Sequence, residues 1–320
     1  MVCALTRACA FLALAALVLA APARAQKQIA ITIDDLPMAM NSSDLKLMQS
    51  MTAKLLGVLK QQNVPAIGFV NESQLYVTGE TDARIAVLRS WLDSGMELGN
   101  HTFSHPRLFT TPLPQFQDDV VRGDVVLRRL LGERKQAPRY FRHPFLSTGP
   151  SAQVRDDFEA FLKSRGYTVA PVTVDHTDYM FASAYANALR AGDAALATRV
   201  REAYLAHLEP ALEYFEKLSR AVTGGEHPHV LLIHANQLNA DSIEQMLAIL
   251  RTRGYSFVSL ETALKHPAFA LKDGYAGPPG IVWQHRWAEG LGKPNKFRED
   301  PDPPQFILDL WNNRNRPPQN

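Results

Sequence analysis

The sequence predicts an α/β fold in which mostly parallel strands form a closed or nearly closed barrel. Short apolar runs of strand length alternate with segments of helical apolar spacing, which is typical of parallel βα units. Ionisable side chains follow directly after the predicted strands, and α/β barrels carry their chemistry at those strand ends. These side chains are Asp34, Asp35, His101, Arg142, Asp175 and His234. An open, doubly wound sheet is the alternative architecture.

Local patterns predict each element in turn. β-branched and aromatic runs such as 29–33 predict strands, whereas apolar residues three or four apart, as in 44–62, predict helices. A capping residue within 42–44 starts that helix, and Gly95 ends the next one. The predicted strands are 29–33, 64–70, 96–99, 139–142, 167–174, 230–233 and 255–259. The predicted helices are 44–62, 81–94, 114–131, 151–165 and 240–253.

Two stretches depart from this alternation. Residues 180–225 contain no predicted strand and indicate a helical insertion into the catalytic barrel, which we place at residues 26–265. Residues 266–320 form a proline-rich extension that we expect to be an irregular tail. Three tryptophans in it argue against full disorder. We expect them to pack against the outside of the barrel, and stacking on sugar faces is the alternative. They are Trp283, Trp287 and Trp311.

The first 25 residues have the form of a secretory signal peptide. Arg7 precedes an apolar run over residues 8–21, and small residues around Ala25 form a cleavage site. The run is shorter than the ~20 residues that a membrane-spanning helix needs, so cleavage is favoured over a retained anchor. We therefore expect an exported protein, periplasmic or secreted, with no stable membrane span after cleavage.

Composition excludes several other classes of protein. The chain has 320 residues, 46% hydrophobic and 21% charged, which is enough to bury a sizeable core. A formal net charge of +2 argues against a nucleic-acid binder that depends on phosphate neutralisation. The only cysteines, Cys3 and Cys9, lie in the predicted signal peptide, so a disulfide framework is excluded.

Candidate metal ligands and acid–base groups occur together in the predicted strand ends. His101 and His105 are four residues apart, so on a helical turn both can bind one ion. Asp34 and Asp35 are adjacent carboxylates after a buried-type strand, where like charges are costly unless a cation compensates. One of them can bind a metal while the other moves a proton. His234 is the best candidate for the group that protonates a leaving atom.

Five ordered motifs resemble those of the polysaccharide deacetylase family, carbohydrate esterase family 4. The family's Thr-Phe-Asp-Asp, His-Ser/Thr-x-x-His, Arg-x-Pro-Tyr/Phe, Asp-x-x-Asp-Trp and Leu-x-His segments correspond to residues 32–35, 101–105, 142–145, 175–179 and 232–234. Ile33 replaces Phe and Tyr179 replaces Trp, which changes pocket walls rather than chemistry. The resemblance covers roughly residues 29–179 and 230–260 and implies a distorted (β/α) barrel, often with seven strands rather than eight.

The resemblance also implies a single-metal site. Asp35, His101 and His105 are expected to bind one divalent metal ion, which is usually zinc in this family. Cobalt, nickel, manganese or iron(II) are compatible with the same donors. Asp34 is expected to be the general base, paired with Arg142.

The same resemblance assigns the remaining motif residues. His234 is expected to be the general acid, with its pKa raised by Asp175. The backbone N–H of Phe145 is expected to stabilise an oxyanion, and Asp178 and Tyr179 to shape the pocket.

We therefore predict a metal-dependent hydrolase that removes acetyl groups from N-acetylated sugars of a polysaccharide or oligosaccharide. The nearest alternative uses the same site on an O-acetyl ester or a small non-sugar amide. An iron oxygenase with two histidines and one carboxylate, and a binding protein that has lost catalysis, are the alternatives from other classes. The sequence determines neither the glycan nor the oligomeric state.

Overall fold

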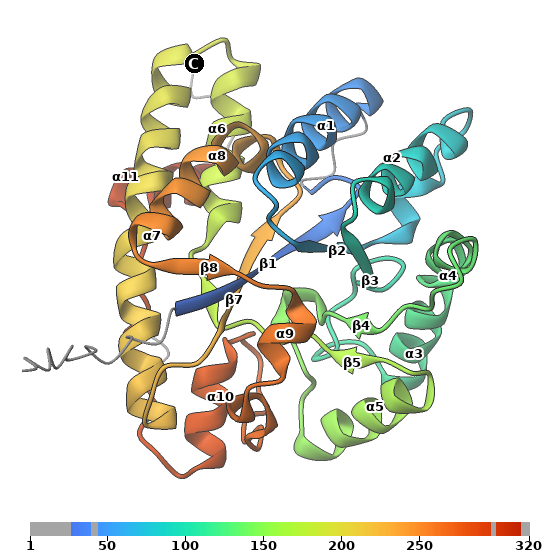
Figure 1. Ribbon diagram of the computed structural model, residues 1–320, viewed down its shortest axis with the longest axis vertical. Coiled ribbons are helices and arrows are strands. Elements are labelled where there is room, and N and C mark those ends of the chain that lie inside the picture. The colour runs from blue at the N-terminus through green and yellow to red at the C-terminus, as the bar shows by residue number, and fades with distance from the viewer. Residues whose placement is uncertain (1–26, 40–43, 296–298, 315–320) are drawn as a thin grey trace, which may run out of the picture.

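Parallel strands curl into a half-barrel whose outer face is covered by helices (Figure 1). The computed structural model describes residues 27–39, 44–295 and 299–314. Seven strands follow one another in the order β5-β4-β3-β2-β1-β7-β6, and β8 pairs with the start of β1. The strands are β1 Lys27–Leu36, β2 Ala66–Val70, β3 Glu97–Asn100, β4 Tyr140–Phe141, β5 Thr168–Val169, β6 Val174–Asp175, β7 His229–His234 and β8 Tyr255–Phe257. The predicted distorted (β/α) barrel is confirmed.

The central strand, β1, sets the position of the strand ends. It pairs in parallel with β2 on one side and with β7 on the other. Ile29, Ile31 and Ile33 are buried, as β-branched residues on a covered strand should be. Asp34 lies directly opposite His234 of β7 in the register. Two ionisable side chains that are far apart in the sequence therefore meet at one edge of the sheet.

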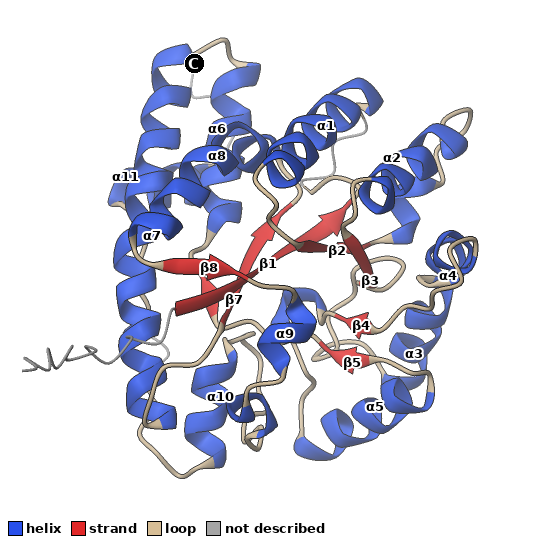
Figure 2. Ribbon diagram, in the orientation of Figure 1, coloured by secondary structure: helices blue, strands red, loops and turns tan. Residues whose placement is uncertain are grey.

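Helices surround the sheet, as Figure 2 shows. They are α1 Leu45–Gln61, α2 Thr81–Asp93, α3 Leu113–Arg122, α4 Val125–Gly132, α5 Ala152–Ser164, α6 Asp178–Arg190, α7 Ala194–Thr223, α8 Gln237–Thr252, α9 Leu260–Leu264, α10 Trp283–Gly290 and α11 Gln305–Asn313. The stretch that we predicted as a helical insertion forms most of α6 and the whole of α7.

Two predicted elements are divided in the structure. The single helix expected over 114–131 is α3 and α4, which separate around Gly123. A Cβ at Gly123 would lie 2.4 Å from the backbone carbonyl carbon of Thr102, so the chain needs glycine at this close approach. The extended run over 167–174 is two short strands, β5 and β6.

The carboxy-terminal extension is not the irregular tail that we expected, because it contains α10 and α11. Within the described residues β5 and β6 share no ladder, and the extension covers the segment between them. The backbone N–H of Trp283 donates to the Val172 carbonyl at 2.8 Å, and the side chain of Gln284 donates to the Thr173 carbonyl at 2.8 Å. Trp283 and Trp287 are buried, as expected of aromatic residues.

The predicted signal peptide at residues 1–25 lies outside the described residues. Among the helices that the structure describes, none has the length and apolar character needed to cross a membrane.

The close approach at Gly123 gives a test of the fold. We expect Gly123→Ala to lower the free energy of unfolding by about 1–3 kcal/mol, because the methyl group displaces the backbone of the loop that carries His101 and His105. Gly57→Ala is the matched control, since nothing lies within 4 Å of that position in α1. This control should raise stability by about 0.5–1 kcal/mol, as alanine favours a helix interior. Urea denaturation measures both changes, and equal effects at the two positions would contradict the packing described.

Candidate active site

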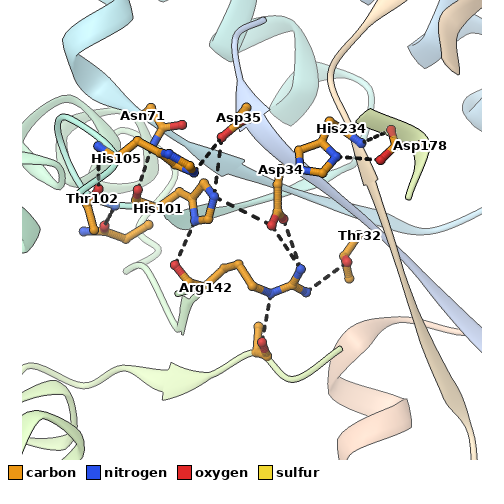
Figure 3. A network of polar contacts seen from close by, with 12 residues as sticks. Thr32, Asp34, Asp35, Asn71, His101, Thr102, His105, Arg142, Asp178 and His234 are labelled. Atoms are coloured by element: carbon orange, nitrogen blue, oxygen red, sulfur yellow. Dashed lines mark hydrogen bonds and ion pairs between the residues drawn. The ribbon is translucent and has the colours of Figure 1, made fainter. Parts of the chain in front are cut away.

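A buried ion pair holds Asp34 at the end of β1. Asp34 is 2% exposed, and the Arg142 Nη1 donates to both of its carboxylate oxygens at 3.1 and 3.2 Å. Arg142 follows β4 and is itself fixed, because its Nε donates to the Ala170 carbonyl and its Nη2 to the Thr32 hydroxyl. Burial raises the pKa of Asp34 to about 6, although Arg142 acts to lower it. The expected pairing of these two residues is present (Figure 3).

Asp35, His101 and His105 converge beside this pair. One ligand atom from each lies within 4.8 Å of the others. The Asp35 Oδ1 is 3.5 Å from the His101 Nε2 and 3.3 Å from the His105 Nε2. Asp35 has a φ of 65°, an uncommon value for a residue other than glycine. The three side chains point toward one another in Figure 3.

The donor set of this cluster fits a single divalent metal ion. The buried Asp35 Oδ1 accepts no hydrogen bond from any described residue, so an acceptor is left for an ion. The His101 Nδ1–H donates to the Arg142 carbonyl at 2.8 Å, which leaves the lone pair of its Nε2 facing Asp35. Burial lowers the pKa of both His101 and His105, which favours the neutral imidazoles that bind metals. The residues do not distinguish one divalent ion from another.

The histidine pair lies on a loop, so the helical turn that we expected is wrong. Thr102 and His105 have positive φ values of 70° and 58°, and residues 101–105 are not helical. Asp119 of α3 holds this loop, since its carboxylate accepts from the backbone N–H groups of Phe103 and Ser104 at 2.9 and 2.8 Å. The carboxylate of Asp119, rather than a helical turn, therefore holds the two histidines in position.

His234 pairs with Asp178 and not with Asp175, which corrects the expected partner. The His234 Nδ1 lies 2.7 Å from the Asp178 Oδ1, and the His234 backbone N–H donates to the same carboxylate at 3.0 Å. Asn236 and Asn239 also donate to Asp178. Asp175, at the end of β6, instead accepts from the backbone N–H of Thr177 at 2.9 Å.

These contacts fix the charges of the pair. Burial alone would lower the pKa of His234, but the Asp178 carboxylate raises it to about 10. The charge and hydrogen bond of His234 hold the pKa of Asp178 below its usual range against the effect of burial. Burial raises the pKa of Asp175 to about 6. An imidazolium held by a carboxylate is suited to donate a proton.

One cavity of about 600 Å³ joins these groups. Its walls include Asp34, Asp35, His101, His105, Asp175 and His234, together with the expected Phe145 and Tyr179. Phe145 is 47% exposed and has a φ of 56°, within the turn after β4. Asp178 is fully buried behind His234, so it positions the imidazole rather than lining the cavity.

The cavity is also lined by residues that the sequence did not place there, and three of them have aromatic or charged side chains. Trp311 lines it, which corrects the expected packing of that tryptophan on the outside of the barrel. Arg107 and Arg314 line it as well. Trp311 and Arg314 lie beyond the motifs, and no local pattern places a distant extension over a strand end.

Comparisons with known proteins bear on the same segments. The sequence model of a family described as "Polysaccharide deacetylase" matches residues 21–170, which contain the five strands β1 to β5 and the cluster of Asp35, His101 and His105. The chain belongs to the polysaccharide deacetylase family. The family expectation drawn from the five motifs is thereby confirmed.

Individual relatives of this polysaccharide deacetylase family member are distant. A peptidoglycan-N-acetylglucosamine deacetylase of Bacillus cereus is 23% identical over 240 residues, 73% of this chain and 66% of that protein. This chain thus spans slightly less than two thirds of that relative.

Solved structures also match this chain. A mutant of a family 4 pseudoenzyme from Bacillus anthracis has a TM-score of 0.50 and 17% identity, over 75% of this chain and 68% of that one. A family 4 carbohydrate esterase from Streptomyces lividans, in complex with acetate, has a TM-score of 0.48 and 20% identity, over 74% and 95%. At 17% identity the likeness to the pseudoenzyme concerns the fold alone.

The convergence of three donors predicts a measurable affinity for metal. We expect the metal-stripped protein to bind one zinc ion per chain. Asp35→Asn should weaken that binding at least about 100-fold, because a neutral amide replaces the carboxylate. Asp175→Asn is the control, since it removes a carboxylate of the same cavity that is not in the cluster. Titration calorimetry measures both affinities, and zinc binding that survives Asp35→Asn unchanged would contradict the ligand set.

Proposed function

We propose that this protein is a metal-dependent hydrolase that removes acetyl groups from N-acetylated sugars of a polysaccharide or oligosaccharide and releases acetate. One observation carries the proposal. A cluster of three metal donors lies in one cavity together with a candidate base, Asp34, and a candidate acid, His234. Amide hydrolysis needs an activated water, a stabilised oxyanion and a protonated leaving nitrogen.

The metal site would be formed by Asp35, His101 and His105, with zinc as the first candidate. A divalent ion held there supplies Lewis acidity, which makes water easier to deprotonate and polarises an acyl oxygen. Asp34 takes the proton from the attacking water, because its carboxylate borders the cluster without being part of it. Arg142 holds that carboxylate in place on its opposite side.

The second half of the reaction requires a proton donor and an oxyanion donor. The His234 Nδ1 is occupied by Asp178, so the Nε2 is left to donate a proton to the leaving amine. The backbone N–H of Phe145, at the cavity wall, is the proposed oxyanion donor. Tyr179 and Asp175 line the same cavity beside these groups.

The two ion pairs favour this function over the alternatives from other classes. An iron oxygenase has a use for the two histidines and one carboxylate, but none for Asp34–Arg142 or His234–Asp178. A binding protein that had lost catalysis would not need a histidine with its pKa raised to about 10.

The class of substrate and the location are also proposed. The Bacillus cereus relative is named for N-acetylglucosamine in peptidoglycan, which supports an N-acetylated glycan as substrate. The signal-peptide pattern of residues 1–25 supports export to such a glycan. The formal net charge of +2 argues against a nucleic-acid partner.

Acetate release tests the function directly. We expect acetate from N-acetylglucosamine oligomers, little from O-acetylated xylan or simple amides, loss of release after chelation, and recovery with zinc. Asp34→Asn should lower kcat about 10²–10⁴-fold and still bind zinc, because the base is lost and the cluster is kept. Circular dichroism checks that this variant folds. Acetate release that resists chelation, or an unchanged kcat in Asp34→Asn, would refute the mechanism.

The partner of His234 predicts a pH effect. Asp178→Asn removes the charge that raises the pKa of His234, so the alkaline limb of kcat/KM against pH should move to lower pH. Asp175→Asn should move that limb less, since Asp175 makes no hydrogen bond to His234 among the described contacts. A larger shift in Asp175→Asn than in Asp178→Asn would reverse the assignment of the partner.

A further inference from the structure

The carboxy-terminal extension builds one wall of the active-site cavity. The cavity is lined by the neighbouring residues Pro279 and Gly280 and by Trp311, which follows them by more than 30 residues in the sequence. A Cβ on Gly280 would lie 1.7 Å from the Phe145 carbonyl oxygen, so the extension lies directly against the turn that carries the proposed oxyanion donor. This wall is an integral part of the site and not a covering laid over it.

Trp311 occupies a defined position in that wall. It lies on α11, which packs against α6 and is anchored by the fully buried Ile307. Its ring centroid is 5.2 Å from that of Tyr179, at an interplanar angle of 75°. The Tyr179 ring in turn lies 6.3 Å from the ring of His234. A row of rings therefore leads from the proposed acid to the wall, where the C–H face of a sugar can stack on an aromatic face.

Two arginines line the same cavity without a carboxylate partner among residues 27–39, 44–295 and 299–314. The guanidinium of Arg314 lies 3.5 Å from the centroid of the Trp311 ring, and its Nη1 donates to the Trp311 carbonyl. The guanidinium of Arg107 lies 4.2 Å from the centroid of the Phe145 ring, and its Nη1 donates to the Pro278 carbonyl. Each guanidinium has five N–H donors, so most of them are left for a ligand.

The carboxylates of the cavity do not neutralise these arginines. Asp34 is paired with Arg142, Asp35 faces the two histidines, and Asp175 accepts from Thr177. The cations at the cavity wall are thus available to a negatively charged group on the substrate. A guanidinium fork matches a carboxylate better than it matches any neutral group of a sugar.

We propose that this cavity selects acidic glycans: a sugar ring beside the reacting N-acetyl group stacks on Trp311, and a carboxylate attached to that sugar pairs with Arg314 and Arg107. This inference rests on the proposed function for the reacting group, but the recognition itself needs no turnover. The carboxylate can belong to a uronic acid or to a lactyl ether, and both present the same chemistry.

Binding of three tetrasaccharides tests the inference. One is neutral and contains only N-acetylglucosamine, one alternates N-acetylglucosamine with glucuronate, and one alternates it with N-acetylmuramic acid. We expect the zinc-loaded Asp34→Asn protein to bind at least one acidic tetrasaccharide about fivefold to tenfold tighter than the neutral one in calorimetry, with the advantage falling as salt is added. Comparison of the two acidic tetrasaccharides shows whether the cavity prefers the carboxylate of a uronic acid or that of a lactyl ether.

Variants in the same background separate charge from stacking. Arg314→Gln should lower the ratio of acidic to neutral affinity, since only Arg107 is left to pair with the carboxylate, and Arg314→Lys should restore part of it. Trp311→Ala should weaken all three ligands roughly tenfold, because stacking does not depend on the charge. Arg199→Gln is the matched control. Arg199 belongs to α7 and lies over Phe306 of α11, 4.1 Å from the ring centroid, outside the cavity. This control should leave the ratio unchanged.

The outcomes distinguish the inference from the function on which it rests. Equal binding of neutral and acidic tetrasaccharides, no binding of any of them, or a preference that is unchanged in Arg314→Gln overturns the inference. A charge preference that depends on Arg314, found together with no acetate release by the zinc-loaded wild-type protein, supports the inference and refutes the proposed deacetylation.

Discussion

Two adjacent carboxylates at the end of the central strand are the constraint on which the site depends. Asp34 is almost fully buried, and one oxygen of Asp35 is buried beside it. Burying two negative charges side by side is costly unless positive charge lies close to each. Arg142 meets this need for Asp34, and the histidine cluster with its proposed ion meets it for Asp35. The positive φ of Asp35 directs the two side chains to these separate partners.

The residues that hold Arg142 and the histidines in place come from several parts of the chain. Arg142 is held by Thr32 and Ala170, and the histidine loop by Asp119. Removing one member of a buried ion pair typically costs about 3–5 kcal/mol, because the remaining charge is left without compensation. Stability and the arrangement of the site are therefore linked through the same contacts. On the other side of Asp34, Asp178 accepts hydrogen bonds from His234, Asn236 and Asn239. These bonds fix the imidazole of His234 in one orientation.

The sequence predicted what depends on local pattern. Apolar runs located the strands, and the parallel arrangement brought Asp34, His101 and His234 to one edge of the sheet. The sequence did not show which acid of the fourth motif contacts His234. Asp175 ends β6, whereas Asp178 begins α6, and the turn between them brings Asp178 to β7. Which of the two acids reaches His234 depends on the backbone path through the two residues between them, His176 and Thr177, and motif spacing does not determine that path.

Packing between elements that are distant in the sequence could not be predicted either. Spacing of four residues suggested a helical turn for the two histidines, but Asp119 of α3 holds them in a loop. Trp311 has the ordinary pattern of an aromatic residue in a tail, and only the docking of α11 on α6 places it in the cavity. Both cases involve contacts between elements that are distant in the sequence.

The most direct measurement of the central claim is X-ray absorption spectroscopy of the zinc-loaded protein. Two imidazole nitrogens and a carboxylate oxygen predict a first shell of nitrogen and oxygen atoms at about 2.0–2.2 Å, with outer-shell scattering from two imidazole rings. Loss of one imidazole contribution in His105→Ala would support the assignment. A spectrum with oxygen ligands and no imidazole scattering would contradict the convergence of Asp35, His101 and His105 on one ion.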